Sequence, residues 1–346
     1  MKKILICLCC LSFFVFPVSA MDFQAPTAPD IARKYINEET ESFSEGLWYI
    51  ICRTISTMNP EIRQACTSSI LLVSIALLTS ISSNFIKSGS SIINLIATIS
   101  VSSVLIKSAN SYISLGISTV QQLSEYGNSL LPVMTAAMAA GGGTTTAASN
   151  YAATAMFDAI LCNGISKILI PMLYIFLCLS ITRCVTEHDA IIQIKNGIKW
   201  LITWVLKISL YVFTGYLTVT GIVSGSVDSS VLKAAKITLS GAVPVVGNII
   251  SDASEAILVS ASLMKNAAGV YGILTLFAVF LSPFLTIGLQ HMLLKITAGI
   301  CKMFGSTKCV DLILNFSTVM GFLLAMTGTV CLLHLIGTVC FMKGVA

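Results

Sequence analysis

Long apolar runs separated by short polar links dominate the chain. A run of about 20 apolar residues is long enough to cross the hydrocarbon core of a bilayer as a helix. Six such runs are predicted to span a membrane: residues 65–82, 92–106, 165–182, 198–223, 270–290 and 319–341. The pattern therefore predicts an all-α polytopic membrane protein.

Two further apolar stretches are interrupted by glycine and proline. Residues 130–160 contain Pro132 and the glycines Gly141, Gly142 and Gly143, and a later stretch contains Gly241, Pro244 and Gly247. Backbone that leaves a helix at membrane depth must be packed inside protein, because lipid offers no hydrogen-bond partners. We expect two broken or re-entrant segments within the bundle. Each break either exposes backbone groups to a solute or is only a turn between packed helices.

Two other segments are predicted to form helices without crossing the membrane. Residues 107–129 are rich in serine and are expected to form a surface helix around Val120, Leu123 and Tyr126. Residues 42–55 are apolar on one side, and either lie along the membrane interface or dock against the protein body.

Composition excludes a soluble globular protein. Hydrophobic residues make up 55% of the chain, charged residues 10%, and the mean hydropathy is +0.90, whereas a soluble domain carries about 25% charged residues. The lipid bilayer is thus an expected partner. The net charge of +5 does not indicate nucleic-acid binding, since the lysines are scattered at the ends of apolar segments.

The charge pattern predicts three regions and an orientation. Residues 1–20 resemble a signal peptide, with an uncleaved first helix as the alternative. An acidic extracytoplasmic segment (21–64) and a membrane body (65–346) follow, the body including the interrupted segment 231–269. The basic links at 183–199 and 291–310 are expected in the cytoplasm. Both ends of the mature chain would then lie outside, provided that residues 130–160 cross the membrane an even number of times.

Charged residues around the second break are candidate path or assembly residues: Lys233, Lys236, Asp252, Glu255 and Lys265. Asp252 and Glu255 are three apart and would share one face of a helix. They either stabilise the positive end of that helix, line a water-filled path opposite the lysines, or simply lie in solvent.

We expect the polar groups inside or near other spans to have structural roles. His334 lies in the last predicted span, and we expect a satisfied core histidine rather than a proton relay, because no acid is within reach along its helix. Asp158 and Asp311, near span ends, are expected at the interface. Of the twelve cysteines, Cys52 and Cys66 form the extracytoplasmic pair worth testing for a disulfide.

Neither catalytic nor metal-binding motifs are recognisable. The sequence has no phosphate-binding loop, no nucleophile elbow and no His-Glu-x-x-His motif. Cysteine and histidine spacings do not match a zinc site. We therefore expect no enzyme activity, no cofactor and no metal.

The region of Gly141–Gly143 and that of Gly241–Gly247 share a weak similarity in sequence pattern. This similarity indicates either two structural repeats or chance.

The stretch 231–272 carries a family resemblance. Its segments AAK, PVVG, SDASEAI and SASLMKN follow one another in the order typical of the stage III sporulation protein AE family of endospore-forming Firmicutes. The resemblance covers most of the chain, is strongest from residue 197 onward, and reaches back weakly to Gly141–Gly143.

The resemblance implies a role in endospore formation. It implies a membrane component of the channel or secretion-like complex that joins mother cell and forespore, located in the mother-cell membrane around the forespore. Implied partners are other stage III sporulation proteins, namely ring-forming subunits and an ATPase-like cytoplasmic protein, and a forespore-side partner. An ordinary secondary transporter and a pure membrane scaffold are the alternatives.

Overall fold

The computed structural model describes the backbone of residues 26–36, 43–85, 90–186, 189–242, 247–304 and 307–343. Side chains between residues 220 and 265 are not among those described. The predicted signal peptide and Pro244 also lie outside the described residues.

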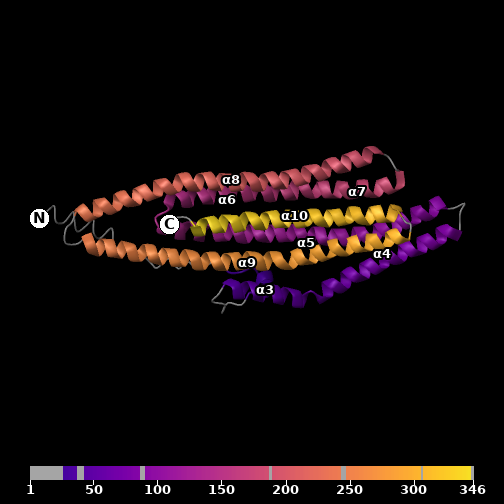
Figure 1. Ribbon diagram of the computed structural model, residues 1–346, viewed down its shortest axis with the longest axis horizontal. Coiled ribbons are helices and arrows are strands. Elements are labelled where there is room, and N and C mark those ends of the chain that lie inside the picture. The colour runs from indigo at the N-terminus through magenta and orange to yellow at the C-terminus, as the bar shows by residue number, and fades with distance from the viewer. Residues whose placement is uncertain are drawn as a thin grey trace.

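The described chain is built from helices, with no strand in these ranges. In order they are α2 (Asp30–Arg33), α3 (Phe43–Thr57), α4 (Asn59–Phe85), α5 (Ser90–Ala140), α6 (Thr144–Gly164), a π-helical turn (Ile165–Leu169), α7 (Ile170–Thr186), α8 (Asp189–Ala242), α9 (Gly247–Met303) and α10 (Thr307–Lys343). They form an elongated bundle with α5 and α10 at its centre (Figure 1). On one side α9 covers this centre, with α3 and α4 beyond it, and α6, α7 and α8 lie on the other side.

Five described helical segments are long and apolar enough to cross a membrane: Asn59–Ser82, Thr144–Thr186, Asp189–Val219, Asn266–Met303 and Thr307–Met342. This confirms the predicted all-α polytopic class. Predicted span 92–106 falls in α5, which is not among the five. Its exposed Ile92 and Ile99, like Ile70 and Leu78 of α4, give the outer surface the large apolar side chains that lipid contact requires.

The bundle is longer than a bilayer is thick. With 57 residues in α9 and a rise of 1.5 Å per residue, that helix measures about 85 Å, against about 30 Å for a hydrocarbon core. Parts of the bundle therefore lie beyond the hydrocarbon layer. At one end, α8 and α9 run past the other helices as a pair (Figure 1).

The glycine run at 141–143 is a tight turn between α5 and α6. Gly142 adopts a positive φ of 91°, which favours a residue without a Cβ. Its N–H donates to the carbonyl of Ala139 (2.9 Å), and that of Gly143 donates to the carbonyl of Met138 (3.2 Å). The break is thus a turn between two packed helices. Pro132, by contrast, lies inside α5 without ending it. The predicted interruption of the helix at Pro132 is therefore wrong.

Residues 107–129, predicted to form a surface helix, have one face exposed and the other buried in the bundle. Val120, Leu123 and Tyr126 are at most 2% exposed, and this part of α5 lies at the bundle centre. Hydroxyl groups here bond within their own helix: both Ser118 and Thr119 donate to the carbonyl of Leu115. Such back-bonding satisfies the hydroxyls without water, so Thr119 can be buried, whereas Ser111 and Ser114 stay exposed.

Helix α3 docks against the body of the protein. Gly46 faces Leu274 of α9, where an added Cβ would stand 2.8 Å from a leucine methyl, and Ile50 is 1% exposed. Trp48 on the opposite side is exposed. Of the two predicted alternatives for this segment, docking is therefore observed.

Candidate functional site

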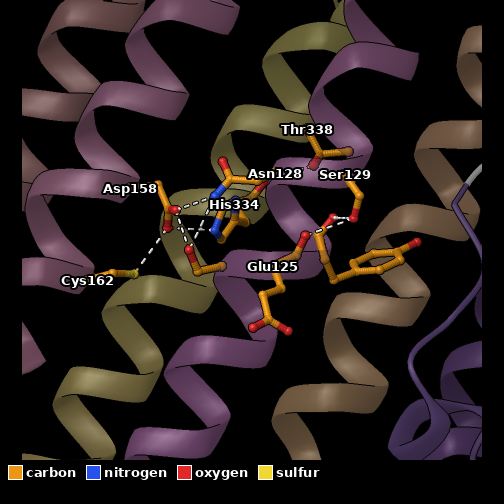
Figure 2. Close-up of polar contacts among 9 residues, drawn as sticks. Glu125, Asn128, Ser129, Asp158, Cys162, His334 and Thr338 are labelled. Atoms are coloured by element: carbon orange, nitrogen blue, oxygen red, sulfur yellow. Dashed lines mark hydrogen bonds and ion pairs between the residues drawn. The ribbon is translucent and has the colours of Figure 1, made fainter.

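The most unusual feature of the bundle interior is a buried acid paired with a histidine. Asp158 of α6 and His334 of α10 have side chains that are 1% and 2% exposed. The Nε2 atom of His334 lies 2.9 Å from Oδ1 of Asp158. Both residues lie within helical segments that are long and apolar enough to cross a membrane. Figure 2 shows them facing each other between the two helices.

Helix α5 completes the surroundings of the carboxylate. Ser124 donates its hydroxyl to Oδ2 of Asp158 (2.5 Å). The amide of Asn128 donates to the same oxygen (2.9 Å) (Figure 2). The thiol of Cys162, one turn along α6, donates to Oδ1 at 3.3 Å. Each carboxylate oxygen thus has two neighbours able to donate a hydrogen bond. We call Ser124, Asn128, Asp158, Cys162 and His334 the buried charged cluster after its buried Asp158–His334 pair; Ser124 and Cys162 are half-buried and Asn128 is exposed.

A glycine makes room for the histidine ring. A Cβ added at Gly127 of α5 would overlap the His334 imidazole. Because residue 127 lacks a side chain, α5 approaches α10 closely enough to place Ser124 and Asn128 on the carboxylate. The cluster therefore depends on close packing of the neighbouring helices α5 and α6 against α10, which is far from both in sequence.

The polar character continues along one face of α6. Asn150 and Thr154 precede Asp158 at intervals of four residues and are 2% and 1% exposed. Oδ1 of Asn150 and Oγ1 of Thr154 have no hydrogen-bond partner among the described residues. Thr154 instead contacts Gly337 of α10, where an added Cβ would stand 3.1 Å away. This polar line leads from the cluster toward the α5–α6 turn.

Sequence reasoning missed this cluster. The expectation that Asp158 lies at the interface is wrong, because it is buried and bonded to His334. His334 is indeed a satisfied core histidine, but its partner is an acid 176 residues away in sequence. Searching for an acid along the same helix could not find it. A usable signal was the presence of Ser124 and Asn128 in α5, four residues apart on one face.

The residues predicted around the second break lie on two helices. Lys233, Lys236 and Gly241 belong to α8, and Gly247, Asp252, Glu255 and Lys265 belong to α9. The contacts of these side chains lie outside the description, as does Pro244 between the two helices. Their predicted role therefore stays a prediction. None of these residues belongs to the buried charged cluster.

Cysteines and possible metal ligands add no second site. Cys52 and Cys66 are free thiols, so the disulfide between them is not formed. Within the described residues, no three His, Cys, Asp or Glu side chains are grouped to hold a metal ion. The buried charged cluster is thus the main concentration of ionisable chemistry inside the described bundle.

These observations define a polytopic helical membrane protein with a buried acid–histidine cluster. The chain belongs to the stage III sporulation protein AE family, whose model matches residues 30–344. The family resemblance and the sporulation class are thereby confirmed. The family is described as one of sporulation proteins.

A relative and the solved structures give further comparisons. The stage III sporulation protein AE of Bacillus subtilis (strain 168) is 23% identical over 211 residues, which cover 58% of this chain and 51% of that protein. The match thus spans about half the length of the curated relative. No solved structure matches the chain.

Proposed function

We propose that this protein is a membrane component of the channel complex between mother cell and forespore, located in the mother-cell membrane and needed for late forespore development. Its family membership supports a role in sporulation, and its apolar helices support a place in a membrane. It acts without catalysing a reaction of its own.

The buried charged cluster is the observation that supports a channel-like role. A scaffold needs only apolar packing between its helices, whereas an acid and a histidine inside a membrane bundle lose hydration and are costly to keep. Such residues in membrane proteins mark ion or solute pathways more often than plain packing. The polar line through Thr154 and Asn150 supplies a continuation of such a pathway.

The ends of the bundle are proposed to meet different partners. The paired extension of α8 and α9 (Figure 1) lies opposite the basic links, so it would face the space between the two membranes. There it would contact ring-forming subunits and the forespore-side partner. The basic end, with the links after α7 and α9, would face the cytoplasm and an ATPase-like protein.

Deleting the gene in frame in its native host tests this function. We expect normal growth and completed engulfment, followed by forespores that shrink and fail to express late genes. Fluorescence imaging of membranes together with a late forespore reporter measures both steps. Normal spores would contradict the proposal and favour an ordinary secondary transporter, which uptake assays would then examine.

Neutral replacements of Asp252 and Glu255 separate a path from an assembly role. If these acids line a path, Asp252→Asn with Glu255→Gln abolishes late forespore expression while the complex still assembles, because charge is lost and shape is kept. Co-purification of partners and the same reporter measure the two outcomes. The matched control is Asp30→Asn, whose carboxylate is 96% exposed; it should leave both unchanged. Unaltered spores in the double variant would support the scaffold.

A further inference from the structure

A second site lies at the basic end of the bundle. A cavity of about 450 Å³ opens between α7, α8 and α10. Three cations line it, Arg183 from α7 and Lys195 and Lys199 from α8, against one carboxylate, Asp311 of α10. The amides of Asn196 and Asn315 complete its polar lining. The excess of positive charge indicates a site for an anion.

The burial of Lys195 is the strongest evidence that the cavity binds an anion. The residue is only 8% exposed, and its ammonium lies 5.2 Å from the centre of the Phe176 ring. Among the described residues no carboxylate lies within ion-pair distance of it, and none accepts a hydrogen bond from it. A buried ammonium without an anion is unfavourable. An anion in the adjoining cavity would remove that cost.

The cavity also lies at the level expected for lipid headgroups. Trp200 and Trp204 follow Lys199 on α8, are 62% and 48% exposed, and stack with ring centres 5.7 Å apart. Exposed tryptophans concentrate at the boundary between hydrocarbon and headgroups. Leu314, 42% exposed, lines the same cavity and offers apolar surface to an acyl chain.

We propose that this cavity binds the headgroup of an anionic phospholipid, with the phosphate held by Arg183, Lys195 and Lys199. Basic pockets between membrane helices on the cytoplasmic side suit such headgroups, and the basic links predict that side here. Asp311 repels phosphate but can accept hydrogen bonds from headgroup hydroxyls. The site therefore favours phosphatidylglycerol over a phospholipid without such hydroxyls.

Thermal unfolding of the purified full chain in a neutral detergent tests the site. We expect dioctanoyl-phosphatidylglycerol to raise the unfolding temperature in a saturable manner, because a ligand that binds the folded state stabilises it. Lys195→Gln and Lys199→Gln should each weaken the apparent affinity about fivefold, from the roughly 1 kcal/mol that one cation contributes near a lipid surface. Lys199 is exposed, so its replacement should not impair folding.

Controls distinguish the lipid from other anions and from diffuse charge. Lys302→Gln removes an exposed cation from the end of α9, outside the cavity, and should leave the affinity unchanged. An equal response to dioctanoyl-phosphatidylcholine would overturn the proposal. An equal response to glycerol 3-phosphate or inorganic phosphate would assign the cavity to a soluble anion instead. An equal loss in the Lys302 variant would show that overall charge, rather than this cavity, attracts the lipid.

Discussion

Replacing Asp158 with leucine is expected to lower the free energy of unfolding by about 1–3 kcal/mol, the usual cost of leaving a buried polar group without its hydrogen-bond partner. The change leaves His334 in the bundle interior without its acid, and leaves the donors on Ser124 and Asn128 without their acceptor. Equilibrium unfolding of the purified chain in mixed micelles measures the loss. The control Asn163→Leu alters an exposed residue of the same helix, and should change stability by less than about 0.5 kcal/mol.

The double variant Asp158→Leu with His334→Leu should recover most of that stability. Replacing both members of a buried pair with apolar residues is often neutral or stabilising. The two single changes should therefore show a coupling of about 1–3 kcal/mol, as expected for residues in contact. Strictly additive effects of the two changes would show that Asp158 and His334 do not interact.

Replacing Gly127 with alanine is expected to destabilise the bundle by about 1–3 kcal/mol, which is typical of overpacking in a close-packed core. The new methyl group would occupy the position of the His334 ring and push the imidazole away from Asp158. The same unfolding measurement applies. Gly197→Ala is the matched control, because no atom lies within 4 Å of the added Cβ; it should be neutral or stabilise the helix by up to about 1 kcal/mol.

A second change tests whether the ring is the cause. In a His334→Ala background the space beside residue 127 is empty, so the added alanine should cost much less than it does with the ring present. An equal cost in both backgrounds would place the strain elsewhere, against the α5 backbone rather than the histidine.

The general architecture was predictable because it follows from local pattern. An apolar run of membrane length forms a helix wherever it occurs, and this placed the spans around residues 65–82 and 319–341 correctly. The glycine run at 141–143 was recognisable as a break because consecutive glycines favour turns over helix. Only the structure shows that this break is a tight turn with a positive φ at Gly142.

The centre of the bundle was not predictable from local pattern. Serine and threonine made residues 107–129 look like a surface helix, yet the face that carries Thr119, Val120 and Leu123 is buried between neighbouring helices. The Asp158–His334 pair arises only when α6 and α10 pack together, so no spacing within either helix indicates it. Gly127 likewise has its role because of a ring on another helix.

The most direct test of the account places the double variant Asp158→Leu with His334→Leu in the native host. This variant should keep the fold while removing the charge. If the buried charged cluster works in a channel, the protein reaches the membrane at its normal level and engulfment is completed, but late forespore genes stay silent. Normal late expression and normal spores from that strain would contradict the account, and would reduce the cluster to a packing feature of a scaffold.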